Sequence, residues 1–288
     1  MPPTPVAPER AKQRWQVLGS SVRGSSHLRS GLPNQDAIAW SQEAGTILAL
    51  ADGHGSPKCF RSDRGARFAV RSTQSILSRS LCGLFEARAM AGTEQALSSL
   101  AAQIVLDWQR QVDADIEASP FLPSEFMTAE VRRSNGMNPR IAYGSTLLSA
   151  GIVDDAVFCL QIGDGDILAV SDDADVNRIL ARSELKLGDE TESLAMENAA
   201  RQFRFYYSPA GGPAPALILL STDGYANSFR NDSGFLSVGR DILDIIRTDG
   251  LDHVDRNLGL WLSEASRLGS GDDATMGILW RSEPPENL

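Results

Sequence analysis

The sequence predicts an α+β fold. Several apolar runs of strand length follow one another across short turns, which is typical of antiparallel sheets. Four longer segments instead repeat apolar residues at the spacing of one helix face. The 288 residues are 42% hydrophobic and 22% charged, so the chain has enough apolar material for a sizeable core.

The elements can be placed along the chain by these two periodicities. Strands are expected as two short segments within 15–40, and then at 47–51, 143–153, 156–161, 166–171, 216–221 and 274–280. Helices are expected at 62–81, 93–118, 236–246 and 251–268. Residues 119–140 have no clear period and predict a loop or crossover. Residues 178–214 are polar and irregular, and predict a long, mobile functional loop.

Composition excludes several classes of function. The formal net charge of −10 argues against a nucleic-acid or anionic-membrane surface and is compatible with cation binding. Three widely spaced cysteines without a CxxC pair argue against a disulfide scaffold and a structural zinc site, and favour a reducing compartment. With no signal peptide and no apolar run of membrane-spanning length, we expect a cytoplasmic protein. One domain is expected at 15–281, between tails at 1–14 and 282–288.

Four aspartates stand at the ends of predicted core strands. Asp52 and Asp223 each follow an apolar run and precede glycine, and Asp164-Gly165 lies between two strands. Asp272 comes just before the last strand. Any one such pair is also an ordinary turn, because Asp and Gly are common turn residues. Four of them can instead converge on one rim of a sheet.

Four carboxylates at one rim would repel each other and raise one another's pKa values unless cations neutralise them. The ligands would be hard oxygens, which favour Mg²⁺ or Mn²⁺ over Zn²⁺ or Cu²⁺. Several carboxylates, with waters filling the remaining positions, would suit a two-metal site. In such a site the ions lie about 3.5–4 Å apart and a bridging water loses a proton near neutral pH.

The ordered motifs NQD, ADGHG, GST, IGDGD, STDG and GDDAT resemble those of the metal-dependent Ser/Thr protein phosphatases of the type 2C class. The resemblance runs in the correct order from about Trp15 to Trp280. The compact opening between Ser26 and Asp36 is similar to the bacterial branch of that family. The resemblance implies a four-layer α-β-β-α sandwich, with two antiparallel sheets flanked by helices and the metal site at one end.

It also implies two Mg²⁺ or Mn²⁺ ions. Asp52 is similar to the carboxylate that bridges both ions, and Gly53 offers its backbone carbonyl to one of them. Asp223 and Asp272 match the other direct ligands. Asp164 matches a residue that holds a third, weaker ion in some members.

Three further residues match family positions that take part in the reaction. Asp36 matches the carboxylate that orients metal-bound water, and His54 matches the general acid for the leaving alcohol. Arg29 is the best candidate to hold the substrate phosphate, although the spacing of this motif leaves Arg23 and His27 open. Two positions depart from the family pattern: Gln35 stands where many members have Glu, and Asp273 stands where Asn is usual.

The implied function is hydrolysis of phosphoserine or phosphothreonine in proteins by a metal-activated water, opposing a Ser/Thr kinase. Two alternatives remain: a phosphatase dedicated to a single regulatory protein, and a pseudophosphatase that binds a phosphoprotein without cleaving it. The intact Asp52, Asp223 and Asp272 speak against a pure binder. A purely structural metal site would not require His54 beside it.

Overall fold

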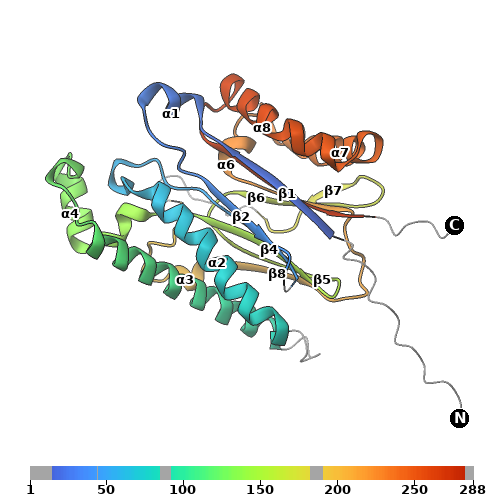
Figure 1. Cartoon of the computed structure of the whole chain (residues 1–288), viewed down its shortest axis with the longest axis horizontal. Helices are drawn as coiled ribbons and strands as arrows, with labels where there is room; N and C mark the ends of the chain where they lie inside the picture. The colour runs from blue at the N-terminus through green and yellow to red at the C-terminus, as the bar shows by residue number, and fades with distance from the viewer. Residues whose placement is uncertain (1–14, 44, 85–91, 182–190, 283–288) are drawn as a thin grey trace, which may run out of the picture.

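The computed structural model describes residues 15–43, 45–84, 92–181 and 191–282. The predicted tail at 1–14 lies outside these ranges, as do residues 283–288 of the predicted tail at 282–288. Two five-stranded antiparallel sheets pack face to face, and helices cover both outer faces. In Figure 1 helices α2 and α3 lie on one side of the strands, and α7 and α8 lie on the other. The predicted α-β-β-α sandwich is therefore confirmed.

Each sheet is built from strands that are distant in the sequence. The first sheet has the order β1 (Trp15–Val22), β10 (Ala274–Arg281), β9 (Leu217–Ser221), β6 (Asp166–Val170) and β7 (Val176–Arg178). The second has the order β2 (Ala37–Ser41), β3 (Thr46–Ala51), β4 (Leu147–Val153), β5 (Ala156–Ile162) and β8 (Arg204–Ser208). The two ends of the described chain thus pair in one sheet, with Trp15 opposite Arg281.

Strand β3 shows how the layers form. All six of its residues are buried, because both faces of the second sheet are covered. Ile47 and Ala49 point toward α2 and α3 and share a core with Trp108, whereas Leu48 and Leu50 point into the core between the two sheets. The period-two alternation of a strand explains this division. A strand with two covered faces reads as one continuous apolar run.

The helices have these bounds: α1 (Ser25–Ser30), α2 (Ser62–Leu84), α3 (Thr93–Ala118), α4 (Ala129–Met137), α5 (Ala199–Gln202), α6 (Asp223–Ala226), α7 (Asp232–Asp249) and α8 (Leu251–Leu268). Short 3₁₀ turns lie at η1 (Pro57–Cys59), η3 (Pro123–Glu125) and η4 (Pro139–Tyr143). Within the described ranges, no helix combines the length and the apolar character that a membrane span requires.

Three expectations from the sequence are wrong. Strands β5 and β6 are neighbours along the chain but belong to different sheets, so the turn at 163–165 crosses the sandwich. The segment 119–140 is not a plain loop, because it contains η3 and α4. The segment 178–214 contains α5 and β8, the edge strand of the second sheet, and its residues 182–190 lie outside the described part.

Candidate metal centre

The predicted aspartates converge at one end of the sandwich. Asp52 follows β3, Asp223 opens α6 directly after β9, and Asp272 lies just before β10. Asp164 lies in the turn that crosses from β5 to β6. Electrostatic repulsion links them. In addition to the larger effect of burial, the charges of Asp223 and Asp272 raise the pKa of Asp52, and the charge of Asp164 raises the pKa of Asp223. Strand ends that are far apart in the sequence thus meet at one rim, as the Asp-Gly pattern predicts.

Asp36 is buried behind this rim. Its Oδ2 accepts hydrogen bonds from Thr222 Oγ1 at 2.8 Å and from Thr275 Oγ1 at 2.7 Å. Burial raises the pKa of Asp36 from 3.8 to about 8, because the two hydroxyl donors offset only part of the cost of desolvation. Repulsion by Asp273 and Asp223 raises this pKa further.

Asp52 and Asp223 are the centre of the cluster. Burial is the largest cause of the raised pKa of each, followed for Asp52 by the charges of Asp36 and Asp223. The two carboxyls lie close together, and each affects the pKa of the other. Carboxylates in this position are costly to ionise unless a cation lies among them. The donor set consists of hard oxygens, so it fits Mg²⁺ or Mn²⁺.

The backbone around Asp52 is fixed by strand β4. The Asp52 amide donates to Thr146 Oγ1 at 3.1 Å, and the Thr146 amide donates to the Asp52 carbonyl at 2.8 Å. Thr146 therefore hydrogen-bonds to the backbone of Asp52 in both directions. Gly53 follows in a position that has no room for a side chain, since a Cβ there would lie 2.7 Å from the carbonyl oxygens of Gln35 and Ser62. This close packing sets the position of the Gly53 backbone.

Asp273 is a structural anchor next to the predicted ligand Asp272. Its Oδ1 accepts from the Gly24 amide at 2.6 Å, and its Oδ2 accepts from the Gln35 amide at 2.6 Å. His27 Nδ1 lies 2.9 Å from the same Oδ2. The carboxylate at this position thus ties the start of β10 to the segments on both sides of α1. An Asn side chain has a single acceptor oxygen, so it could not accept all three bonds.

His27, Asp272 and Asp273 also form a compact group. Each offers one ligand atom, and these atoms lie within 4.8 Å of one another, a spacing that no other trio of acidic, His or Cys residues reaches within the described ranges. Asp52, Asp223 and Asp272 are therefore spaced more widely. Water would have to complete the coordination of any ion that they share.

Asp164 and the backbone of His54 are each held by a hydrogen bond from or to a neighbouring segment. Asp164 Oδ2 accepts from Thr191 Oγ1 at 3.0 Å. The His54 amide donates to the Gly144 carbonyl at 3.0 Å, so the Gly53–Gly55 turn is fixed against the start of β4. His54 is half-buried, two residues beyond Asp52.

The phosphate-holding arginine remains a prediction. Arg29 lies on the exposed side of α1, and its guanidinium donates to Ser26 Oγ at 3.1 Å. Arg23 is half-buried and donates to the His27 carbonyl at 2.9 Å. His27 itself is engaged with Asp273. Among the described residues, neither the Arg29 nor the Arg23 guanidinium hydrogen-bonds to an aspartate of the cluster.

Two charged residues near the centre were missed by the sequence reasoning. Asp166, the first residue of β6, is 2% exposed, and its Oδ1 accepts from Arg178 Nε at 2.5 Å. Arg204 on β8 donates to the Gly163 carbonyl and is attracted by Asp164. Both residues support the crossing turn that carries Asp164. Arg204 was not identified from the sequence because strand β8, which carries it, was not predicted.

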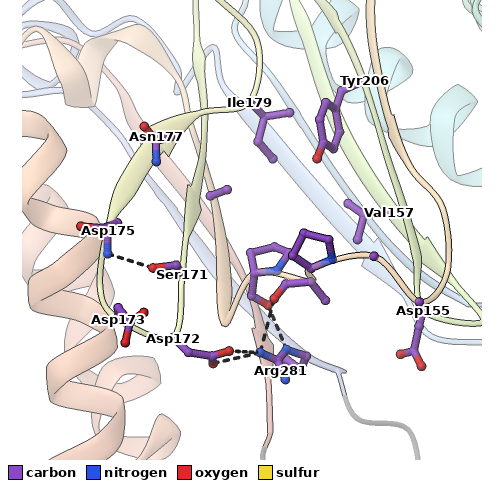
Figure 2. Close-up of a pocket in the computed structure, with 16 residues that line it drawn as sticks. Asp155, Val157, Ser171, Asp172, Asp173, Asp175, Asn177, Ile179, Tyr206 and Arg281 are labelled. Atoms are coloured by element: carbon purple, nitrogen blue, oxygen red, sulfur yellow. Dashed lines mark hydrogen bonds and ion pairs between the residues drawn. The ribbon is translucent and has the colours of Figure 1, made fainter.

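A cavity of about 580 Å³ opens at the opposite end of the sandwich, where β6 ends and β9 begins (Figure 2). Asp172, Asp173 and Asp175 are exposed in the turn beside it. Arg281 Nη2 lies 2.9 and 2.7 Å from the two carboxylate oxygens of Asp172, so this pair is already matched in charge. This end lacks the buried carboxylates that distinguish the first centre among the described residues.

Comparisons with known proteins agree with the fold. PppA, described as a key regulatory component of T6SS in Pseudomonas aeruginosa, superimposes with a TM-score of 0.59 at 18% identity, over 92% of this chain and 97% of that one. The serine/threonine phosphatase Stp1 from Staphylococcus aureus superimposes with a TM-score of 0.60 at 13% identity, over 97% of this chain and 100% of that one. At these identities the likeness shows the fold alone.

Sequence comparison identifies the family. Serine/threonine-protein phosphatase 3 of Escherichia coli (strain K12) is 27% identical over 161 residues, which are 54% of this chain and 53% of that protein. The chain thus matches about half the length of this curated relative. The family model described as protein phosphatase 2C matches residues 23–263. This match covers most of the chain and includes Asp36, Asp52, Asp164 and Asp223, and it shows that the chain belongs to the protein phosphatase 2C family.

Proposed function

We propose that this protein is a metal-dependent phosphatase that hydrolyses phosphoserine or phosphothreonine in other proteins. The observation that carries the proposal is the meeting of Asp36, Asp52, Asp223 and Asp272 at one end of the sandwich. The charge of this cluster calls for divalent cations, and the family is one of phosphoprotein phosphatases.

Asp52, the Gly53 carbonyl, Asp223 and Asp272 would hold two Mg²⁺ or Mn²⁺ ions, with Asp164 available for a weaker third. When bound, such ions supply positive charge for the phosphate oxygens and lower the pKa of a coordinated water. The protein's own side chains would carry out the remaining steps.

Asp36 is suited to orient the attacking water, because the two threonine hydroxyls fix its carboxylate in one position. His54 is suited to give a proton to the leaving serine or threonine oxygen, since imidazole titrates near neutral pH. Arg29 would approach the phosphate through a two-pronged guanidinium contact. A kinase that phosphorylates Ser or Thr would produce the substrate.

The test is hydrolysis of a phosphothreonine peptide, measured as released phosphate, with and without Mn²⁺. We expect turnover with Mn²⁺ or Mg²⁺ and none in EDTA. Binding of the phosphopeptide without release of phosphate, at saturating Mn²⁺, would instead identify a pseudophosphatase. Full activity in EDTA, or restoration by zinc alone, would contradict the two-metal assignment.

A further inference from the structure

A cavity of about 740 Å³ opens beside His54. One wall comes from the end of α4 and from η4, and includes Met137 and Ile141. The facing wall comes from residues 191–197 and includes Ala195 and Met196. Its volume lies within the range of about 300–1,000 Å³ that is usual for ligand pockets.

The two walls are fastened to each other and to the second sheet. Asn138 Nδ2, just after α4, donates to the Ala195 carbonyl at 3.0 Å across the cavity. The Leu194 amide donates to the Ser145 carbonyl at 2.9 Å, next to the start of β4. The cavity is therefore built into the fold.

The cavity lies next to the aspartate centre. His54 lines it, and it is the residue that we place at the leaving oxygen. Thr191, on the facing wall, also lines it and donates to Asp164 Oδ2 at 3.0 Å. A peptide whose phosphate reaches the aspartates would therefore continue past His54 into this space.

The chemistry of the walls indicates what part of the peptide enters. Met137 is 83% exposed, and Ile141, Ala195 and Met196 lie around the same space. Methionine side chains are flexible and polarisable, so they adapt to apolar groups of different shape. The hydroxyl of Ser134 can supply a hydrogen bond for a peptide backbone.

We propose that this cavity binds an apolar side chain of the substrate protein that lies within a few residues of the phosphorylated serine or threonine. This inference rests on the proposed phosphatase function and names its substrate class. The protein would then select phosphorylation sites by sequence, in addition to recognising the phosphate.

The experiment compares kcat/KM for phosphothreonine peptides that carry leucine or glycine at each of three positions on either side of the phosphothreonine. We expect the wild type to prefer leucine at one of these positions by roughly tenfold, the size of discrimination that a hydrophobic pocket provides. In Met137→Glu this preference should disappear, because the added carboxylate would be desolvated against leucine. Met137→Ala should reduce the preference by a smaller factor.

Met127→Glu is the matched control. Met127 is 82% exposed, lies just before α4 and is not part of the cavity wall, so the leucine preference should stay at its wild-type value. A wild type that shows no preference at any position would overturn the proposal, as would equal preference ratios in Met137→Glu and Met127→Glu. Hydrolysis of para-nitrophenyl phosphate separates the two claims: if the wild type cleaves neither it nor any peptide, the proposed function itself is wrong.

Discussion

At the scale of single residues, burial and charge explain the behaviour of the centre. Asp36 is 7% exposed and Asp273 is 3% exposed, yet both are satisfied by hydrogen bonds from Thr222, Thr275 and nearby amides. Asp52 and Asp223 have each other as close partners. The aspartates at this end of the sandwich are therefore of two kinds. Some are anchors whose oxygens accept hydrogen bonds from the protein, and others are carboxylates that favour a bound cation.

His54 allows a test that separates proton donation from metal binding. If His54 protonates the leaving oxygen, His54→Gln should slow phosphopeptide hydrolysis more than para-nitrophenyl phosphate hydrolysis, by a factor on the order of 10²–10⁴. The reason is that para-nitrophenolate leaves readily as an anion, whereas a serine or threonine alkoxide needs a proton. Calorimetry should give an unchanged Mn²⁺ affinity. Equal losses on both substrates would make His54 a positioning residue.

Asp36 predicts how the stability of the metal-free protein depends on pH. Its folded pKa of about 8 lies above the ordinary 3.8, so the unfolded chain releases this proton first as the pH rises. The free energy of unfolding in EDTA should therefore fall between about pH 4 and pH 8. Asp36→Asn keeps the acceptor oxygen and removes the charge, so it should flatten this slope and raise the unfolding midpoint at pH 8 by several degrees, at roughly 2–4 °C per kcal/mol. Thermal unfolding at a series of pH values measures this. An unchanged slope would contradict the assignment.

At the scale of elements, a buried arginine organises the segment that leads to α4. Arg61 Nε donates to Glu125 Oε1 at 2.8 Å, and its Nη1 donates to the Ser119 carbonyl at 2.6 Å and to Tyr143 Oη at 2.8 Å. The guanidinium also lies 4.6 Å from the ring centroid of Phe121. This network fixes η3 against α2 and η4, and so positions the wall of the cavity beside His54.

Arg61→Met should destabilise the protein by about 3–5 kcal/mol, because it leaves Glu125 without its charge partner in a largely buried site. Chemical denaturation monitored by circular dichroism measures the loss. Arg67→Met is the control: Arg67 is half exposed and pairs with Asp63 one helical turn away, so its removal should cost about 0.5 kcal/mol or less. Equal losses in the two variants would show that the Arg61 network adds nothing beyond a surface pair.

At the scale of the whole molecule, the metal centre joins the two sheets. Asp52 directly follows a strand of the second sheet, whereas Asp223 and Asp272 adjoin strands of the first. Cations bound between them would hold the two sheets together at this end of the sandwich. Metal binding should therefore affect the stability of the entire fold and not only the loops at the site.

Mn²⁺ should raise the unfolding midpoint of the EDTA-treated protein. A ligand that binds only the folded state stabilises it by about 2.7 kcal/mol at a free concentration 100 times the Kd. In Asp223→Asn this gain should be much smaller, and turnover should drop by orders of magnitude, while the metal-free variant is at least as stable as the wild type. Differential scanning calorimetry with and without Mn²⁺ measures both effects. Wild-type turnover of the variant at saturating Mn²⁺ would show that Asp223 is only a turn residue.

The sequence by itself determined the features that depend on local pattern. The buried strand 47–51, the four long helices and the aspartates at strand ends follow from periodicity and from Asp-Gly pairs, which each segment carries alone. The sequence also predicted that the aspartates meet at one rim, because the strands of a sandwich can end only at one of its two ends. The ordered motifs placed the chain in its family.

Only the tertiary structure decided the features that depend on partners distant in the sequence. Strand β8 lies in a segment that is polar overall, and its place is decided by pairing with β5, where Cys159 pairs with Tyr206. Strand β6 belongs to the first sheet because it pairs with β9. The short connection between β5 and β6 does not show this in the sequence. Asp166 is buried because Arg178 reaches it, and α4 has its place because the network of Arg61 fixes the segment before it. In each case the stabilising contact is made with a residue that no local pattern could identify.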